Sequence, residues 1–481
     1  MTKFQKQMLT IAAAGALTAV TALPAMALEN EFHGMFAVKT FLSNFDNGGL
    51  LLKENSKTNN YTDQRTRVQY IAKASDDLKL VTHFEMNTSW GGANTTPTNV
   101  AGTTTTLDTN GGDIDTDGTN LWVKHAYLDF NIGKNLNVKA GQQAYKDTLS
   151  GLYVDADLPM AYVTYKQGAY TLGLGYSRFN DEQTLSVGYD SYKGDAAGDL
   201  YAIDNTFAIN KDTKVGFSYY LNRDDSYGDN ATAAAATDVE RKINTLGLFA
   251  ATKMGALDLS GFVAMQKGYS HAVTTGAKTK YHGWATNVLA KMKLGNGVAR
   301  TGFLFTSGDN NDAAGSNHGW QTLSSNGSSS AINSYNESGM MLLVRNTSMG
   351  GTSTDVYFRK PVTNIALLHA GYNANLSEKL YANGNIGFAW LPSSGHILGA
   401  TGVETMTGAQ LTAANLSGQQ KGSDFMGTEL NAEVGYKLYS NLTLKAQAAY
   451  VMLGGAYKDI LVGGKDVNDP FTLRLGAHYS F

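Results

Sequence analysis

The C-terminal segment 471–481 reads FTLRLGAHYSF and ends at Phe481. Every second residue from Phe471 onwards is apolar or aromatic, and the residues between them are polar or small. Side chains along a β-strand point alternately to its two faces, so this segment predicts a strand with one apolar face and one polar face. The same alternation recurs in segments 170–176, 215–221, 430–438 and 442–452. The chain is therefore predicted to be all-β.

The connections between these segments are of two kinds. Short ones, such as 133–135, 167–168 and 440–441, contain hairpin-turn residues. They alternate with long polar stretches, such as 91–119, 223–239, 307–338 and 391–424. Several segments are about 10–12 residues long, which suits a tilted membrane-crossing strand. Short turns at one end and long loops at the other are typical of a transmembrane antiparallel β-barrel, with periplasmic turns and extracellular loops.

The alternation predicts about 18 strands, an even number that leaves both chain ends on the short-turn side. A barrel of 16 strands is the alternative, because 241–253 has no cleanly apolar face and 307–362 is irregular. Within that irregular stretch, 340–344 is either a further strand or a loop folded into the lumen. The predicted strands are 31–43, 63–74, 79–89, 121–132, 136–145, 160–167, 169–179, 199–210, 213–222, 241–253, 256–266, 281–294, 298–306, 363–375, 379–390, 426–438, 441–453 and 470–481.

The composition excludes several classes of protein. The 481 residues include no cysteine, which rules out a disulfide scaffold, an iron–sulfur cluster and c-type haem attachment. The formal net charge of −3 offers no broad basic face, so no nucleic-acid partner is expected. The sequence contains no nucleophile elbow, no HExxH and no dinucleotide fingerprint, so no enzyme activity is expected.

The N-terminus has the three parts of a secretory signal peptide. Lys3 and Lys6 precede an apolar run over 8–23, and Ala25-Met26-Ala27 has the small residues of a cleavage site. The alternative, an N-terminal membrane anchor, is less favoured because the run is short. The prediction is a signal peptide over 1–27 and one barrel domain over 28–481.

Taken together, these features resemble the porins of Gram-negative outer membranes. The resemblance rests on the signal peptide, on the terminal aromatic Phe481 and on hairpins such as YIAKASDDLKLVTHFEM at 70–86. It implies a barrel in the outer-membrane lipid, inserted by the barrel-assembly machinery with Phe481 as the assembly signal. It also implies small hydrophilic solutes as permeants, and it allows a homotrimer.

The alternation also selects residues for the inner face, where wall charges govern passage. Since barrel closure pairs the last strand with the first, five basic residues on four adjacent strands should form a basic wall: Lys39, Arg65, Arg67, Lys445 and Arg474. Acids flank this wall. The other predicted pore-lining residues are His83, Glu85, Glu429 and Glu433. The alternative is that all of these charges form local salt bridges and select nothing.

The connection over 146–159 contains Asp155 and Asp157. In porins the third long loop often folds inward and narrows the pore, so the resemblance implies that these acids face the basic wall. An ordinary surface loop is the alternative.

Asp113, Asp115 and Asp117 have the D-x-D-x-D-G spacing of calcium loops, on a connection predicted to be extracellular. Lys124 occupies the position where such loops carry a bidentate glutamate, so the pattern is incomplete. The alternatives are a structural calcium or a solvated acidic turn. No other cofactor is expected.

The leading hypothesis for function is a porin for passive diffusion of small hydrophilic solutes and ions, with a modest anion preference. The runner-up is a substrate-selective channel. The basic wall would favour anions, and an inward track of Tyr127, Tyr162 and Tyr220 would favour sugars. A structural or adhesin barrel, or a sheath for a conduit of partner-held haems, belongs to a different class.

Overall fold

The computed structural model describes residues 28–45, 58–91, 112, 121–181, 197–225, 239–272, 276–309, 315–323, 332–347, 362–393, 423–458 and 467–481, and all structural statements refer to these. The predicted signal peptide over 1–27 lies outside the described residues. Asp113, Asp115 and Asp117 also lie outside them, so the structure does not test the calcium prediction.

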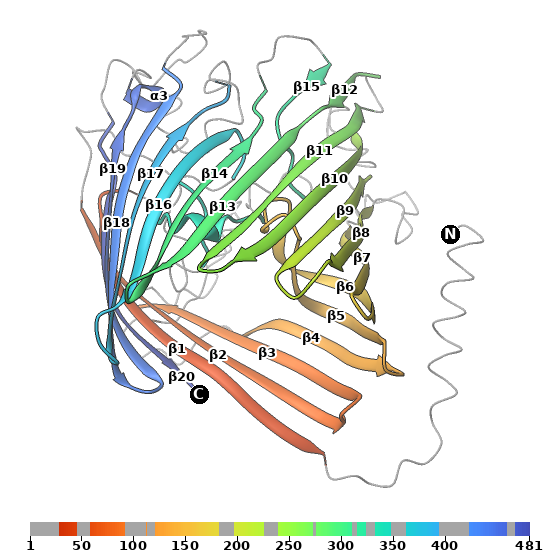
Figure 1. Ribbon diagram of the computed structural model, residues 1–481, viewed down its shortest axis with the longest axis horizontal. Coiled ribbons are helices and arrows are strands. Elements are labelled where there is room, and N and C mark those ends of the chain that lie inside the picture. The colour runs from red at the N-terminus through yellow and green to blue at the C-terminus, as the bar shows by residue number, and fades with distance from the viewer. Residues whose placement is uncertain are drawn as a thin grey trace, which may run out of the picture.

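Eighteen long antiparallel strands in the described residues form one closed barrel (Figure 1). Each long strand pairs with the next along the chain, and β1 pairs with β20 to close the sheet. These strands are β1 (Glu29–Ser43), β2 (Asn59–Ser75), β3 (Leu78–Ser89), β4 (Leu121–Ile132), β5 (Leu136–Lys146), β6 (Asp155–Gln167), β7 (Tyr170–Asp181), β8 (Ala197–Ala208), β9 (Thr213–Asp224), β10 (Val239–Met254), β11 (Leu257–Ala272), β13 (Trp284–Leu294), β14 (Gly297–Thr306), β16 (Ile365–Asn375), β17 (Leu380–Trp390), β18 (Phe425–Tyr439), β19 (Leu442–Leu453) and β20 (Phe471–Ser480).

The remaining elements are short. They are β12 (Lys278–Tyr281), β15 (Ser316–Asn317), the 3-10 helix η2 (Asn336–Ser338) and the helix α3 (Gly455–Lys458). Among the described residues, no helix is long and apolar enough to cross a membrane. The predicted strand over 281–294 is thus divided, because the chain leaves the strand conformation at His282 and Gly283, between β12 and β13.

The two faces of the wall have opposite chemistry, as the alternation predicts. On β20, Leu473 and Leu475 are 47% and 66% exposed on the outside, whereas Thr472 and Arg474 are buried inside. A sheet whose exposed outer face is apolar and whose inner face is polar suits a wall that meets lipid outside and water inside. The prediction of 18 strands is confirmed, and the 16-strand alternative is wrong.

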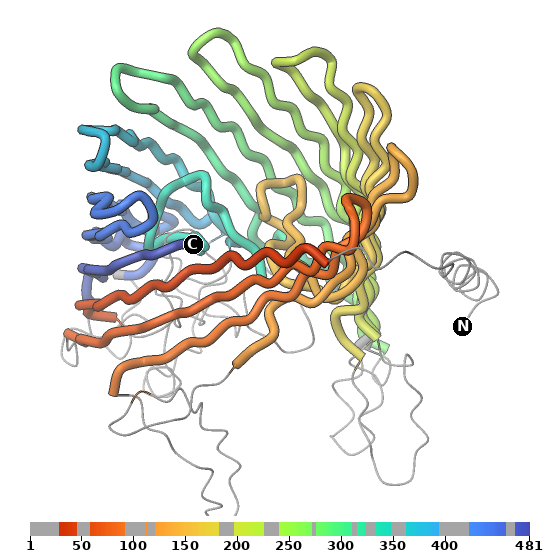
Figure 2. Tube along the Cα trace, turned by 90° about the horizontal axis from the view of Figure 1, so that it is seen from below, coloured from red at the N-terminus to blue at the C-terminus, as the bar shows by residue number. Residues whose placement is uncertain are grey.

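The hairpin of β5 and β6 departs from the regular wall. Pairing of β4 with β5 ends at Ala126 and Gln142, but pairing of β5 with β6 continues to Lys146 and Asp155. The end of this hairpin therefore has no β4 neighbour, and it turns into the barrel (Figure 2). The predicted connection over 146–159 is wrong in its bounds, because Asp155 and Asp157 belong to β6 and the loop is 147–154.

Two segments, which we call the inner loops, lie inside the barrel: 147–154 and 332–347 (Figure 2). Their apolar side chains pack into one cluster that includes Leu149, Leu152, Tyr335 and Leu342, each fully buried. The sequence left two possibilities for 340–344, a further strand or a loop folded into the lumen. The segment has no strand pairing and is buried throughout, so it is the loop.

The seam between β1 and β20 ends in a hydrogen-bonded pair. The Phe481 N–H donates to the Gly34 carbonyl oxygen at 3.0 Å, and the Gly34 N–H donates to the Phe481 carbonyl oxygen at 2.9 Å. A Cβ atom added at Gly34 would lie 2.4 Å from Cζ of Phe481, so the terminal ring occupies the space that the glycine leaves. The terminal residue thus contributes both backbone and ring contacts to closure.

Deleting Phe481 should reduce the amount of folded barrel, because it removes both hydrogen bonds and the ring contact at the seam. The measurement is the fraction of heat-modifiable, folded protein in the outer-membrane fraction. Phe481→Tyr is the matched control and should assemble normally. An unchanged folded fraction in the deletion variant would refute a role for Phe481 in assembly.

Candidate permeation pathway

The first inner loop is organised around a single carboxylate. Asp147 accepts backbone N–H bonds from Leu149 at 2.7 Å, Gly151 at 2.9 Å, Tyr153 at 2.7 Å and Val154 at 2.5 Å. Asp147 is buried, so the loop satisfies its own backbone donors where no sheet partner is available. This hydrogen-bond ring fixes the shape of 147–154.

A second carboxylate fixes the same hairpin to the wall. Asp204 on β8 accepts hydroxyl hydrogen bonds from Tyr145 at 2.9 Å, Tyr162 at 2.9 Å and Tyr220 at 2.7 Å. The ring of Tyr220 also stacks on Tyr153 of the loop, with 5.3 Å between ring centroids. Of the predicted aromatic track, Tyr220 is fully buried and Tyr162 stays partly exposed, with both hydroxyls bonded to Asp204.

A third carboxylate holds the second inner loop. Glu429 on β18 accepts the backbone N–H groups of Met341 at 2.6 Å, Leu342 at 3.1 Å and Leu343 at 2.8 Å. Its side chain is 0% exposed. Glu429 does point inward, as predicted, but it is covered by the loop that it binds, so it does not line open space.

The inner loops are also bonded to each other. The Ser334 N–H donates to the Gly151 carbonyl at 3.0 Å, and Asp155, the first residue after the first inner loop, donates its N–H to the Ile332 carbonyl at 2.6 Å. Together they cover the inward residues of the strands from β9 to β16. These residues are fully buried, namely Ser218, Thr245, Ala285, Leu304 and Leu367. At the level of the inner loops, the open part of the lumen is therefore on the other side, along β1 to β4 and β19.

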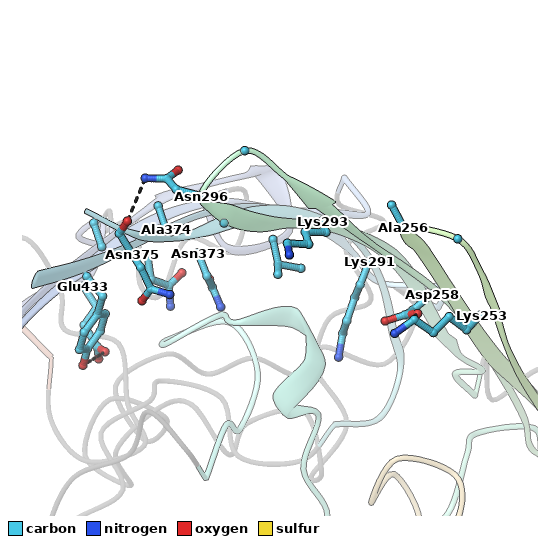
Figure 3. Close-up of a pocket in the computed structure, with 17 residues that line it drawn as sticks. Lys253, Ala256, Asp258, Lys291, Lys293, Asn296, Asn373, Ala374, Asn375 and Glu433 are labelled. Carbon is cyan, nitrogen blue, oxygen red and sulfur yellow. Dashed lines mark hydrogen bonds and ion pairs between the residues drawn. The ribbon is translucent and has the colours of Figure 1, made fainter. Parts of the chain in front are cut away.

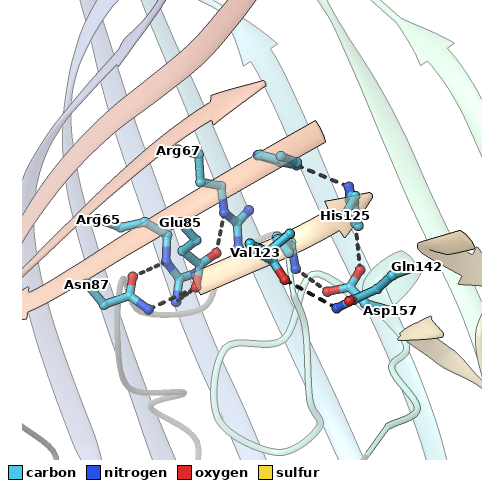
Figure 4. A network of polar contacts seen from close by, with 10 residues as sticks. Arg65, Arg67, Glu85, Asn87, Val123, His125, Gln142 and Asp157 are labelled. Atoms are coloured by element: carbon cyan, nitrogen blue, oxygen red, sulfur yellow. Dashed lines mark hydrogen bonds and ion pairs between the residues drawn. The ribbon is translucent and has the colours of Figure 1, made fainter. Parts of the chain in front are cut away.

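Charged side chains on that open side form the network in Figure 4. Arg67 Nε donates to Glu85 at 2.6 Å, and an Arg65 guanidinium nitrogen lies 3.4 Å from the same carboxylate. Arg65 also donates to Asn87 at 2.7 Å. Arg65, Arg67 and Glu85 all keep partial exposure. Two arginines thus contact one glutamate in this part of the wall.

Two lysines continue the basic surface beyond the arginines. Lys39 and Lys445 are both partly exposed, and both are paired in register with Gly476 on β20. An added Cβ at Gly476 would lie 2.8 Å from Cγ of Lys39, so the lysine stem lies over the glycine. Lys39 and Lys445 therefore lie on either side of Gly476, which has no side chain, on the inner face.

Two of the predicted pore-lining residues beside these lysines are covered. Arg474 is 2% exposed, with its guanidinium 5.4 Å from the centre of the Phe41 ring. Glu433 is 7% exposed and accepts the Tyr381 hydroxyl at 2.9 Å. The alternation places both side chains on the correct face, but it does not show what covers them.

The predicted acids of the third loop are paired with nearby bases. Asp157 binds Lys124 and accepts from His125 Nε2 at 2.9 Å, and His125 contacts His83 through their Nδ1 atoms at 3.2 Å. Asp155 lies 3.4 Å from Lys146. These pairs neutralise part of the negative charge of the acids that were expected to face the basic wall.

Lys124 is a residue that sequence reasoning missed as a lumen group. The register between β3 and β4 shifts between His83 and Phe84, so the alternation changes phase at the bulge. This shift turns Lys124 toward Asp157. A one-residue bulge cannot be read from alternation alone.

A further polar region lies at the short-turn end of the lumen. A cavity of about 870 Å³ there is lined by Lys253, Asp258, Lys291, Asn373 and Glu433, among others (Figure 3). Lys291 and Lys293 alternate along β13 on its inward face, so the sequence did carry the signal for them. Within the described residues, no group of three or more metal-ligating side chains could hold a metal ion.

Comparison with known proteins bears on the fold. No protein-family model and no curated protein sequence matches this chain. Solved structures do match over 94% of the chain. They include OccK5 (OpdH) of Pseudomonas aeruginosa (10% identity, 98% of that chain, TM-score 0.50), OpdK of the same species (12%, 99%, 0.51) and a BenF-like porin from Pseudomonas fluorescens Pf-5 (13%, 98%, 0.50).

At these identities the likeness establishes the fold. The chain has the fold of the outer-membrane porins, an antiparallel barrel of eighteen strands. The agreement covers nearly the whole of each compared chain, so it concerns the entire barrel and not a local motif.

Asp147→Ala should release the first inner loop and raise single-channel conductance. The change leaves four backbone N–H groups without their acceptor, and each such loss in a buried site costs about 1–3 kcal/mol. Conductance in planar bilayers is the measurement. Asp212→Asn, at an exposed short turn, is the control and should leave conductance unchanged. An Asp147→Ala channel with the wild-type conductance would show that the loop does not narrow the pore.

Proposed function

We propose that the protein is a water-filled outer-membrane channel for small hydrophilic solutes, with a modest preference for anions. The observation that carries this proposal is the set of partly exposed bases, Lys39, Arg65, Arg67 and Lys445, on the side that the inner loops leave open. Two of these bases, Arg65 and Arg67, contact the same acid, Glu85.

The anion preference depends on the distance between a permeating ion and the charges of the wall. An ion in a narrow channel responds to wall charges within roughly a Debye length, about 8 Å at physiological salt. The acids nearest the first inner loop, Asp155 and Asp157, already have basic partners in Lys146 and Lys124. The formal net charge of −3 includes acids far from the pathway, which act mainly at the channel mouths. The small local excess of positive charge should therefore outweigh the negative total.

The second candidate is a substrate-selective channel for anionic solutes. It is favoured by the fixed inner loops, because carboxylates that lock their shape also lock the width of the pathway. OpdK, which has the same fold, has also been solved with vanillate. A sugar-selective channel is less favoured, since the hydroxyls of Tyr162 and Tyr220 are used by Asp204. A structural or conduit barrel is less favoured as well, because an exposed charged path remains.

Three further features that the sequence suggests are proposals: a partner in assembly, an oligomeric state and a bound ion. We assign no catalytic residue and no cofactor. The barrel-assembly machinery, a homotrimer and the calcium loop at Asp113, Asp115 and Asp117 each need their own experiment, and chelator-dependent loop protection would test the last.

The charge of the open wall should control selectivity in both directions. Lys39→Gln with Lys445→Gln should lower the anion preference, because it removes two bases from the pathway. Glu85→Gln should raise it, because it frees the charge of Arg65 and Arg67. The measurement is the reversal potential across a salt gradient, and both effects should fade at high salt.

Lys134→Gln with Lys211→Gln is the matched control, since both lysines are exposed at short turns away from the wall. This pair should leave the reversal potential unchanged. A cation-selective wild type would overturn the proposed function. An anion-selective wild type that none of the wall variants alters would show that other residues set the preference.

A further inference from the structure

Basic side chains form a row on the outer face of the barrel, at the long-loop ends of β9 to β12. In register, Arg223 on β9 lies opposite Lys242 on β10, Lys242 lies opposite Tyr269 on β11, and Tyr269 lies opposite Lys280 on β12. The strands lie side by side in this order in Figure 1. Lys267 is on the same face of β11, two residues from Tyr269. We call these four bases and Tyr269 the outer basic row.

The row faces away from the lumen. Lys242 is exposed, whereas its neighbour Ile243 is 1% exposed on the inner face. Arg223 has an exposed side chain, whereas its neighbour Asn222 is buried. Tyr281, next to Lys280, stacks under the inward Arg241 at 5.4 Å, so Lys280 points outward.

The outer basic row lies at the long-loop edge of the band of exposed apolar side chains on the outer face. Below it on the same face lie Leu246, Leu248 and Met265, which are 52%, 55% and 68% exposed. From Met254 at the short-turn end, β10 reaches Lys242 in about 12 residues, and a tilted strand crosses the hydrocarbon core in roughly 9–11. The bases therefore lie where the lipid headgroups of the outer leaflet begin.

The row does not continue over β17 to β20. Outward residues at the same ends of β17 to β20 are apolar or aromatic: Trp390, Leu430, Met452 and Phe471. A general need for solubility at the membrane edge therefore does not explain the bases over β9 to β12.

Within the row, like charges face each other. Lys242 and Arg223 are directly opposite, and like charges in this position destabilise a sheet. Arg223 has acidic neighbours, since Asp225 lies 2.6 Å from it and Asp199, which also contacts Arg178 at 2.9 Å, is opposite it in register. The three lysines are different. Glu240 is beyond Lys242, toward the loop. In the described residues no ion pair involves Lys242, Lys267 or Lys280, so an external anion would complete the row.

We propose that the outer basic row binds the phosphate groups of a phosphorylated glycolipid of the outer leaflet, of the lipid A type. Lysine ammonium groups bind phosphate as point charges, and Arg223 offers a planar fork to the same group. The acyl chains would lie on the exposed apolar side chains below, Leu246 and Met265. Tyr269 supplies an amphipathic ring at the boundary.

The test uses the full-length barrel in detergent and bisphosphorylated lipid A as the probe, with binding measured by native mass spectrometry. The triple variant Lys242→Gln/Lys267→Gln/Lys280→Gln should bind roughly 100-fold more weakly, if each base contributes as one near an anionic lipid surface typically does. The triple Lys→Arg variant should bind like the wild type, which separates charge from packing.

The matched control removes three lysines from the opposite end, as Lys134→Gln/Lys211→Gln/Lys379→Gln, and should bind like the wild type. Dephosphorylated lipid A should bind weakly, and inorganic phosphate should not compete at equal concentration. The proposal is overturned if the row variant keeps wild-type affinity, if the control loses as much, or if phosphatidylglycerol binds as tightly as lipid A.

Discussion

Complete pairing of the backbone is the constraint on which the rest of this structure depends. In lipid, no water satisfies an exposed N–H or C=O group, so a sheet that spans the membrane must close on itself. Here β1 pairs with both β2 and β20, and the final pair between Gly34 and Phe481 completes the seam. Closure fixes which strands become neighbours, and it thereby brings Lys39 and Lys445 together from opposite ends of the chain.

Buried carboxylates solve the same pairing problem inside the barrel. The inner loops have no ladder of their own, and Asp147 and Glu429 accept the N–H groups that a neighbouring strand would otherwise satisfy. Asp204 adds the attachment to the wall through three tyrosine hydroxyls. These acids serve to shape the pathway. By holding the loops against one side, they decide which part of the inner wall meets water.

Many of the charged side chains on the inner face are paired with each other. Arg65 and Arg67 share Glu85, and Asp157 is taken up by Lys124 and His125. Pairing of this kind lowers the field in the pathway without abolishing it. The modest selectivity that we propose rests on this arrangement, in which many inward charges are paired within the wall.

The sequence alone determined the barrel and the facing of its residues, because a strand has a period of two and a lipid-facing wall must be apolar. The segment 471–481 and its repeats were sufficient for that. Only the tertiary structure decided which inward residues are covered. Glu429 and Arg474 obey the alternation, yet loop packing and ring contacts bury them. Lys124 reaches the lumen through a bulge, and Asp155 lies on a strand that continues past its neighbour. Covering and register depend on contacts between segments far apart in the chain, and local periodicity carries no information about those contacts.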